Sequence, residues 1–268
     1  EKIFHLAEYF VHVYSNLEYS IIPGYGPGDM SLFWKEGILP EEMKLFLKYL
    51  RELIGDTMMI GFHGDGTFSI PDGNAMYDFA YAIADDPDGV KARAEAMARA
   101  AIKRNKVLQE NGVDCLFLCS DYCYNSGPFL SPAMFEEFIQ PYLYKIIDEA
   151  RRDGLYTIKH TDGNIMPILN QLVECRPHAL HSLDPMAGVD IREVKRLVGD
   201  KVCLCGNVHC AALQTGTEED VIASAEYCLT YGKPGGGYMF CTSNVPFKGM
   251  DPDRYRLILD VWRRMRYY

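Results

Sequence analysis

Short apolar runs alternate with longer amphipathic segments along most of the chain, a pattern that predicts strands followed by helices. Pro40 marks the start of one helix, and Ser131 with Pro132 marks the start of another. Clear strands are predicted at residues 57–62, 114–119, 157–158, 179–183, 202–205 and 238–240, with a weaker one at 17–22. Helices are predicted at residues 3–15, 40–53, 89–111, 131–150, 165–174, 191–197, 218–230 and 251–266.

The order of these elements predicts the fold class. Strands that alternate with helices, with no two-residue hairpin turns between them, form a parallel sheet. Six clear strands, with one or two weaker early ones, favour an α/β fold of the (β/α)8 TIM-barrel type over an open sheet. The length of 268 residues fits one such domain, so residues 1–268 are predicted to form a single barrel.

Polar side chains follow five consecutive predicted strands, where the chemistry of an α/β protein is usually found. They are Asp121, with Tyr122 after it; His160, Asp162 and Asn164; Asp184; Asn207 and His209; and Cys241 and Asn244. We expect Asp121, His160, Asp184, Asn207 and Asn244 to face a common cavity. Each residue alone reads more simply as a cap or turn residue, so the prediction of a functional site rests on the whole set.

A zinc site is one interpretation of this set. His160 and Asp162 lie two residues apart, a spacing that places both near one ion, and Asp184 or Cys241 would complete the ligands. The alternative, slightly favoured because the chain has no Cys-x-x-Cys and no His-Glu-x-x-His motif, is that His160 hydrogen-bonds the substrate. No Gly-x-Gly-x-x-Gly follows a strand, which argues against a nicotinamide dinucleotide site.

Composition and charge narrow the class of protein. The net charge of −10 argues against nucleic acid or an anionic membrane surface as a partner, and no stretch approaches the length of a membrane span.

The nine cysteines are an odd number, and Cys115, Cys203 and Cys205 lie in apolar runs. We therefore expect these three to be reduced and at least two of them buried, in a cytoplasmic protein.

Several motifs, in order and at fitting spacing from about residue 57 onward, resemble the uroporphyrinogen decarboxylase superfamily. They are HTDGN at 160–164, DPMAGVD at 184–190, VCLCGNV at 202–208, GTEE at 216–219 and GGGYMFCTSN at 235–244. The resemblance implies a TIM barrel and one of two chemistries. One is cofactor-free decarboxylation in porphyrin biosynthesis, and the other is zinc-assisted methyl transfer between a corrinoid protein and a thiol or methoxylated compound.

The chain departs from both branches. The amino-terminal Arg-Gln-Ala-Gly-Arg segment of the decarboxylases has no counterpart, so we expect the chain to lack an amino-terminal segment, and their late His falls at about Asn244. The methyltransferases carry His-x-Cys where this chain has His160 and Asp162, and Gly-Cys-Gly where it has residues 243–245. Asp162 is then a substitute ligand and Cys241 a displaced thiol.

The leading prediction is a cytoplasmic enzyme of the methyltransferase branch that acts on a small molecule. A corrinoid protein is the expected partner, zinc a candidate cofactor and a homodimer a candidate assembly. Its predicted catalytic residues are Asp121, His160 and Asp184; its substrate-binding residues are Tyr122, Asn164, Asn207, His209 and Asn244; and its metal ligands are His160, Asp162 and Cys241. The alternatives are a porphyrinogen decarboxylase, which is a carboxy-lyase, and a non-catalytic ligand-binding barrel. The excess of acids over cations at the predicted mouth argues against the decarboxylase.

Overall fold

The computed structural model describes residues 1–267, which form two compact units. Unit 1 comprises residues 1–68, 77–119 and 141–158, and unit 2 comprises residues 69–76, 120–140 and those from 159 onward. Strand β6 (Tyr156–Thr161) begins in unit 1 and ends in unit 2. Among the described residues, no helix combines the length and the hydropathy needed to cross a membrane.

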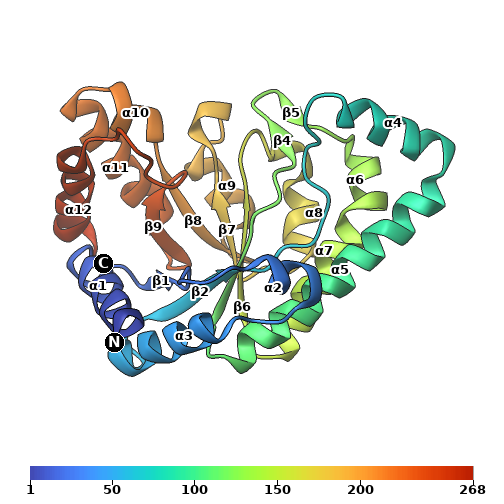
Figure 1. The fold of residues 1–268 in the computed structure, drawn as a ribbon. Coiled ribbons are helices and arrows are strands. Elements are labelled where there is room, and N and C mark those ends of the chain that lie inside the picture. The colour runs from blue at the N-terminus through green and yellow to red at the C-terminus, as the bar shows by residue number, and fades with distance from the viewer. Residues whose placement is uncertain (268) are drawn as a thin grey trace. The chain divides into compact units, whose positions relative to one another are not determined.

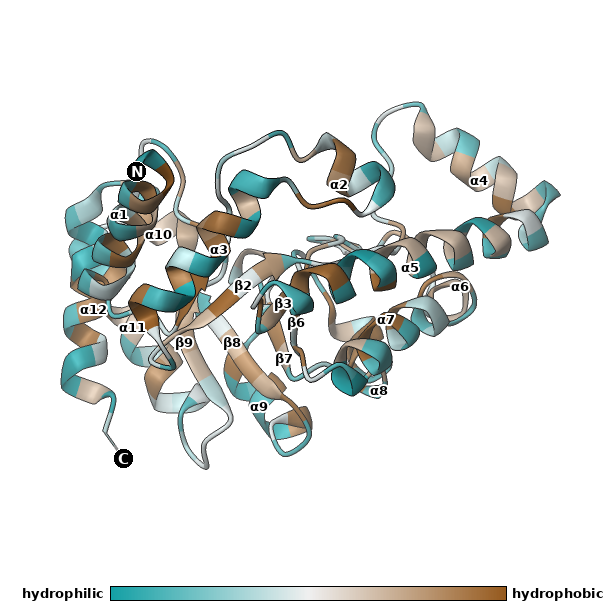
Figure 2. Cartoon of the chain, turned by 60° about the horizontal axis from the view of Figure 1, so that its bottom comes forward, coloured by the Kyte–Doolittle hydropathy of each residue, from teal (hydrophilic) through white to brown (hydrophobic). Residues whose placement is uncertain are grey.

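Unit 1 is built on a parallel strand pairing. In it, β2 pairs with β1 and with β3, so that Ile60 lies beside Ile22 and Phe62 beside Leu116, all of them buried. Its strands are β1 (Ile21–Pro23), β2 (Met59–His63) and β3 (Cys115–Leu118). Its helices are α1 (Lys2–Asn16), α2 (Ser31–Glu36), α3 (Glu41–Ile54), most of α4 (Ala75–Asp85), α5 (Pro87–Glu110) and most of α7 (Gln140–Arg152). In Figure 2 the buried strand β2 is brown, whereas α5 carries alternating teal and brown bands, as expected of an amphipathic helix.

Unit 2 repeats this arrangement and carries the polar strand ends. Its strands β7 (Ala179–Ser182), β8 (Cys203–Val208) and β9 (Tyr238–Thr242), labelled in Figure 1, are parallel. Their register places His181 beside Cys205 and Asn207 beside Cys241. Its helices are α6 (Pro132–Phe138), η1 (Met166–Ile168), α8 (Leu169–Glu174), η2 (Pro185–Ala187), α9 (Ile191–Val198), α10 (Cys210–Thr215), α11 (Glu218–Gly232) and α12 (Pro252–Met265).

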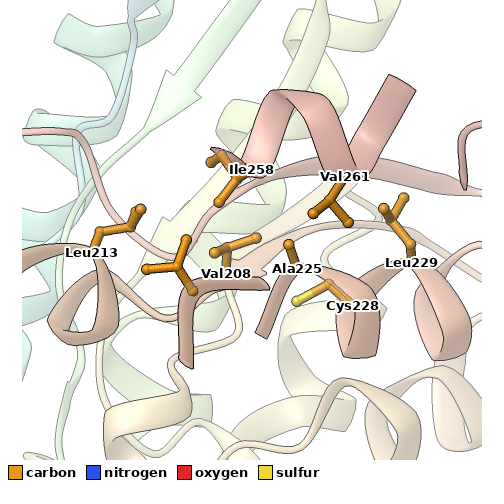
Figure 3. Packing of buried hydrophobic residues seen from close by; sticks show 8 residues of the cluster. Val208, Leu213, Ala225, Cys228, Leu229, Ile258 and Val261 are labelled. Carbon is orange, nitrogen blue, oxygen red and sulfur yellow. The ribbon is translucent and has the colours of Figure 1, made fainter. Parts of the chain in front are cut away.

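Apolar side chains join α11 and α12 to strand β8. In Figure 3, Ala225 and Leu229 of α11 point toward Ile258 and Val261 of α12, with Val208 beside them, and all five are buried. A capping box at Thr217 holds the first turn of α11. The core of unit 2 therefore lies on the helix side of β8 and β9, and the ends of these strands remain available for polar groups.

The predicted fold class is confirmed. The strands follow one another in the hydrogen-bonded order β1-β2-β3-β6-β7-β8-β9, and a helix follows nearly every one, as in an α/β barrel. Two details of the prediction were wrong. A small antiparallel hairpin, β4 (Cys123–Tyr124) with β5 (Gly127–Pro128), has a two-residue turn and follows β3. The helix predicted over 131–150 divides at Ile139 into α6 and α7, because Pro141 lacks the N–H that a continuous helix needs.

The prediction for the thiols is confirmed. All nine cysteines are thiols, with Cys115 and Cys205 buried and Cys203 half-buried. The cytoplasmic location and the single domain stay predictions.

The turn after β6 should tolerate no side chain at Gly163. Gly163 has a φ of +82°, and a Cβ there would lie 2.4 Å from the carbonyl oxygen of Cys123. Gly188 has a similar φ of +76°, but nothing lies within 4 Å of its Cβ position. Gly188→Ala should therefore cost only the left-handed backbone penalty of about 1–2 kcal/mol. Gly163→Ala should cost at least about 1 kcal/mol more, because hairpin β4–β5 must move. Urea denaturation of both variants measures the difference, and equal losses would contradict the predicted clash.

Candidate functional site

The site is built around the carboxyl end of β6 in unit 2. The strand was predicted to end at residue 158, but it continues to Thr161, so His160 lies within it and Asp162 follows directly. Thr161 is buried, and its hydroxyl accepts a hydrogen bond from the backbone N–H of Tyr122 at 2.8 Å. This bond holds the loop after β3, which carries Asp121, against the end of β6.

Three of the predicted site residues form one group. The Nε2 atom of His160 lies 3.7 Å from Oδ1 of Asp121 and 3.7 Å from Oδ1 of Asp162. The backbone N–H of Asp162 donates to Oδ1 of Asp121 at 3.0 Å. One donor atom from each residue lies within 4.8 Å of the other two, a spacing that could hold a metal ion. We refer to Asp121, His160 and Asp162 as the mouth cluster.

Neighbouring strands hold the carboxylate of Asp162 in place. Ser182 at the end of β7 donates from its hydroxyl to Oδ1 at 2.7 Å, and Asn244 after β9 donates from Nδ2 to Oδ2 at 2.6 Å. Burial raises the pKa of Asp162, the bond from Ser182 opposes this shift, and the carboxylates of Asp121 and Asp184 add to it. A nearby cation would therefore stabilise the charged form of the Asp162 carboxylate.

Asp184 borders the same region. Its Oδ2 accepts from the N–H of Gly163 at 3.2 Å, and its Oδ1 accepts from the N–H of Met186 at 2.9 Å, which caps η2. Asp162, Asp184 and Asn244 line a cavity of about 330 Å³, together with Met186, Cys210, Ala211, Gln214, Ser243, Val245 and Phe247. None of these described lining residues is a lysine or an arginine, so the cavity has acidic and apolar walls.

A pair of histidines sets the tautomer of His160. His181 of β7 lies with its Nε2 3.1 Å from the carbonyl oxygen of Thr242, which can only accept, so Nε2 carries a hydrogen. Burial lowers the pKa of His181 to about 4, so its ring is neutral and its Nδ1 has a lone pair. The Nδ1 of His160 lies 2.7 Å from that atom and must donate to it. The lone pair of a neutral His160 is consequently on Nε2, which lies 3.7 Å from a carboxylate oxygen of Asp121 and of Asp162.

A second group of ligand-type side chains lies beside the first. The Sγ atoms of Cys205 and Cys241 are 3.5 Å apart, and both lie within 4.8 Å of a ring nitrogen of His181. The hydrogen bond between the thiols, burial and the neighbouring thiols hold the pKa of Cys241 well above its usual value. We refer to His181, Cys205 and Cys241 as the thiol set. The structure thus groups Cys241 with His181 and brings Asp121 to His160 and Asp162 as the third ligand-type group.

Four of the predicted substrate-binding residues lie elsewhere. The Tyr122 side chain is fully buried against Phe135 and under the ammonium of Lys159, so the structure does not bring it to the cavity. Asn164 accepts from the N–H of Met166 in the turn before η1. Asn207 is buried and donates to the carbonyls of Leu183 and Val189. His209 caps α10, and it lines a separate cavity of about 460 Å³ with Asn207.

Two contributors were missed in the sequence. His181 and Ser182 were read as part of an apolar strand, and no turn residue marks them. The available signal was that both are polar residues within a run that is otherwise buried on both faces. A polar residue inside a buried strand is therefore also a candidate site residue, like the polar residues that follow a strand.

The fold and this site define an α/β barrel protein with an acidic, imidazole-containing centre at the strand ends. The model of the family described as uroporphyrinogen decarboxylase (URO-D) matches residues 43–265, and the chain belongs to this family. The uroporphyrinogen decarboxylase of Shewanella denitrificans is 27% identical over 222 residues, which cover 76% of this chain and 58% of that protein. That of Thioalkalivibrio sulfidiphilus is 26% identical over 227 residues, covering 78% and 60%. The chain thus spans less than two thirds of the length of these relatives.

Among solved structures, a methyltransferase from Methanosarcina mazei is similar with a TM-score of 0.72, over 97% of this chain and 85% of that protein, at 16% identity. At this identity the likeness supports the barrel fold and leaves the reaction open.

The neutral state of His181 predicts a pH dependence of stability. Its pKa is about 4 in the fold against an ordinary 6.5, so between these values the unfolded chain binds more protons and stability falls as the pH is lowered. The difference amounts to about 3 kcal/mol. His181→Gln should lose this part of the acid sensitivity, measured as urea-unfolding free energies between pH 7 and pH 4.5. The exposed His12 offers a control, since His12→Gln should keep the wild-type slope. Equal slopes in all three proteins would show that His181 is not a buried neutral imidazole.

Proposed function

We propose that this protein is a methyltransferase of the URO-D family that moves a methyl group between a corrinoid carried by a partner protein and a small substrate such as a thiol. The observation that carries the proposal is the mouth cluster, an imidazole nitrogen facing two carboxylates beside an acidic cavity. These groups are suited to bind a divalent ion, and Asp184 at the cavity is suited to accept a proton from a neutral acceptor.

The charge of the cavity supports methyl transfer over decarboxylation. A porphyrinogen carries several carboxylates, and a site that binds them needs cations. The described cavity lining offers two carboxylates and neither lysine nor arginine. Lys159 lies nearby in sequence, but its side chain is fully buried and donates to the carbonyl of Ser120. A polyanion would meet like charge in unit 2.

The donor set of the mouth cluster fits a zinc-class ion. One imidazole nitrogen and two carboxylate oxygens are three accepted zinc ligands, and a catalytic site keeps a further position open. A bound ion would supply the positive charge that stabilises the anion of a thiol acceptor. The bond from His160 to His181 keeps Nε2 as the ligand atom, and the bonds from Ser182 and Asn244 orient Asp162.

The remaining roles fall to groups outside the mouth cluster. Asp184 borders the cavity and is not one of the three ligands, so it takes the proton of the acceptor. Met186, Val245 and Phe247 are exposed apolar residues at the same cavity, and they shield the acceptor from water when it is bound. A reducing compartment such as the cytoplasm suits a protein with nine thiols.

The proposal is tested with methylcobalamin as the methyl donor and a panel of small thiols as acceptors. Loss of the methyl–cobalt absorbance and mass spectrometry of the methylated thiol report the transfer. Asp184→Asn should lower the rate about 100-fold or more through loss of the proton acceptor. His160→Gln should abolish the reaction. Tyr227→Phe, in the separate cavity lined by Asn207, should leave the rate unchanged.

A parallel assay with uroporphyrinogen tests the second candidate function, decarboxylation. Decarboxylation is favoured by the curated relatives, which are named uroporphyrinogen decarboxylase. Appearance of products that have lost carboxyl groups, without methyl transfer, would replace the proposal by that activity. Failure of both reactions, with a ligand still bound in the cavity, would leave a non-catalytic binding barrel.

A further inference from the structure

The thiol set has the composition of a metal site, and the proposed function does not use it. Its three members come one each from β7, β8 and β9. His181 is the direct partner of Cys205 in the parallel register, and Cys241 is two residues beyond Met239, the partner of Cys205. Residues two apart on a strand share a face, so the three side chains project to the same side of the sheet. The pairing register of β7, β8 and β9 therefore brings the three side chains of the thiol set together.

We propose that His181, Cys205 and Cys241 form a binding site for one thiophilic divalent ion of the zinc class, separate from the mouth cluster. Two of the three, His181 and Cys205, were not among the metal ligands predicted from the sequence. The site rests on its own geometry and not on the proposed function, and it is tested without an activity assay.

The distance between the two sulfur atoms fits an ion better than a disulfide. Two thiolates bound tetrahedrally at about 2.3 Å from zinc lie about 3.8 Å apart, close to the 3.5 Å between Cys205 and Cys241. A disulfide needs Cα atoms within about 7 Å. Because the two cysteines are diagonal neighbours on adjacent strands, their Cα atoms are expected to lie about 7–8 Å apart.

The charges of an occupied site would cancel. Two thiolates balance a divalent ion, and the neutral imidazole of His181 adds no charge, so a complex around the buried Cys205 and the half-buried His181 and Cys241 carries no net charge. On binding, two S–H bonds are replaced by two metal–sulfur bonds, two protons pass to the solvent, and no atom changes oxidation state. The site therefore needs only the ion as co-reactant.

His181 has the second contact that metal-bound histidines usually make. Its Nε2–H donates to the carbonyl of Thr242, which leaves Nδ1 as the nitrogen with a lone pair. That lone pair now accepts the Nδ1–H of His160. An ion bound there would compete for it, so occupation of the thiol set would alter the hydrogen bond that orients the mouth cluster.

The two groups would hold a bound ion through different ligand atoms. The thiol set offers one nitrogen and two sulfur atoms, whereas the mouth cluster offers one nitrogen and two oxygen atoms. Soft thiolates favour zinc and other thiophilic ions, and carboxylates suit harder ions. The chemistry of the ligands thus makes the two groups distinguishable in one experiment.

The test uses the whole chain, kept reduced and loaded with Zn²⁺ or Co²⁺. X-ray absorption of the zinc protein should show two sulfur neighbours at about 2.3 Å. The cobalt protein should show an intense near-ultraviolet band from thiolate to metal, and loading should release about two protons per ion from the thiols. A wild-type protein that retains no ion after loading, or an ion with only nitrogen and oxygen neighbours, would overturn the proposal.

Variants locate the site. Cys205→Ser and Cys241→Ser should each abolish the cobalt–thiolate band and lower the bound ion by one per chain. Cys228→Ser is the matched control, a buried thiol of the same unit that donates to Oδ1 of Asn207, and it should keep the band. Asp162→Asn should also keep it, which separates this site from the mouth cluster. A band that survives both serine variants of the thiol set would overturn the assignment, and the absorption data on wild type decide the matter if those variants fail to fold.

Discussion

The carboxylate of Asp162 links the strand ends of unit 2. Its backbone N–H binds Asp121 after β3, its Oδ1 accepts from Ser182 of β7, and its Oδ2 accepts from Asn244 after β9. One residue at the end of β6 thereby connects groups that lie far apart in the sequence. Burial disfavours the charged form of the Asp162 carboxylate, so these contacts stabilise the fold only if that charge is compensated. The neutral donors Ser182 and Asn244 orient the Asp162 carboxylate without neutralising its charge. The carboxylate can therefore still bind a cation.

The histidine pair supplies the other constraint. The carbonyl of Thr242 can only accept, and this fixes the hydrogen on Nε2 of His181, then the hydrogen on Nδ1 of His160, and so places the lone pair of a neutral His160 on Nε2. Since burial keeps His181 neutral, the chain of bonds does not reverse near neutral pH. A backbone atom of β9 thus determines which atom of His160 faces the mouth cluster.

The fold could be predicted because its signals are local. Apolar runs predicted the strands, and the Ser131 cap predicted the start of α6 at the right residue. The proximity of Asp121, His160, Asp162, Asp184 and Asn244 could be predicted for the same reason, since polar residues after parallel strands share one edge. The surroundings of Tyr122 and Asn207 could not be predicted, because position along a strand does not tell which way a side chain turns. The Tyr122 ring packs inward on Phe135, and Asn207 closes the loop after β7.

The partners of Cys241 depend on register, which one sequence does not reveal. Cys241 was placed with His160 from the order of the strands, but its neighbours are set by the pairing of β8 with β9, which brings it to Cys205. The same register, continued to β7, adds His181. The strands of unit 2 therefore present oxygen ligands where they end and sulfur ligands within the sheet. A hydrogen bond between His160 and His181 joins these two groups, so an ion bound in one group would alter the hydrogen bonding of the other.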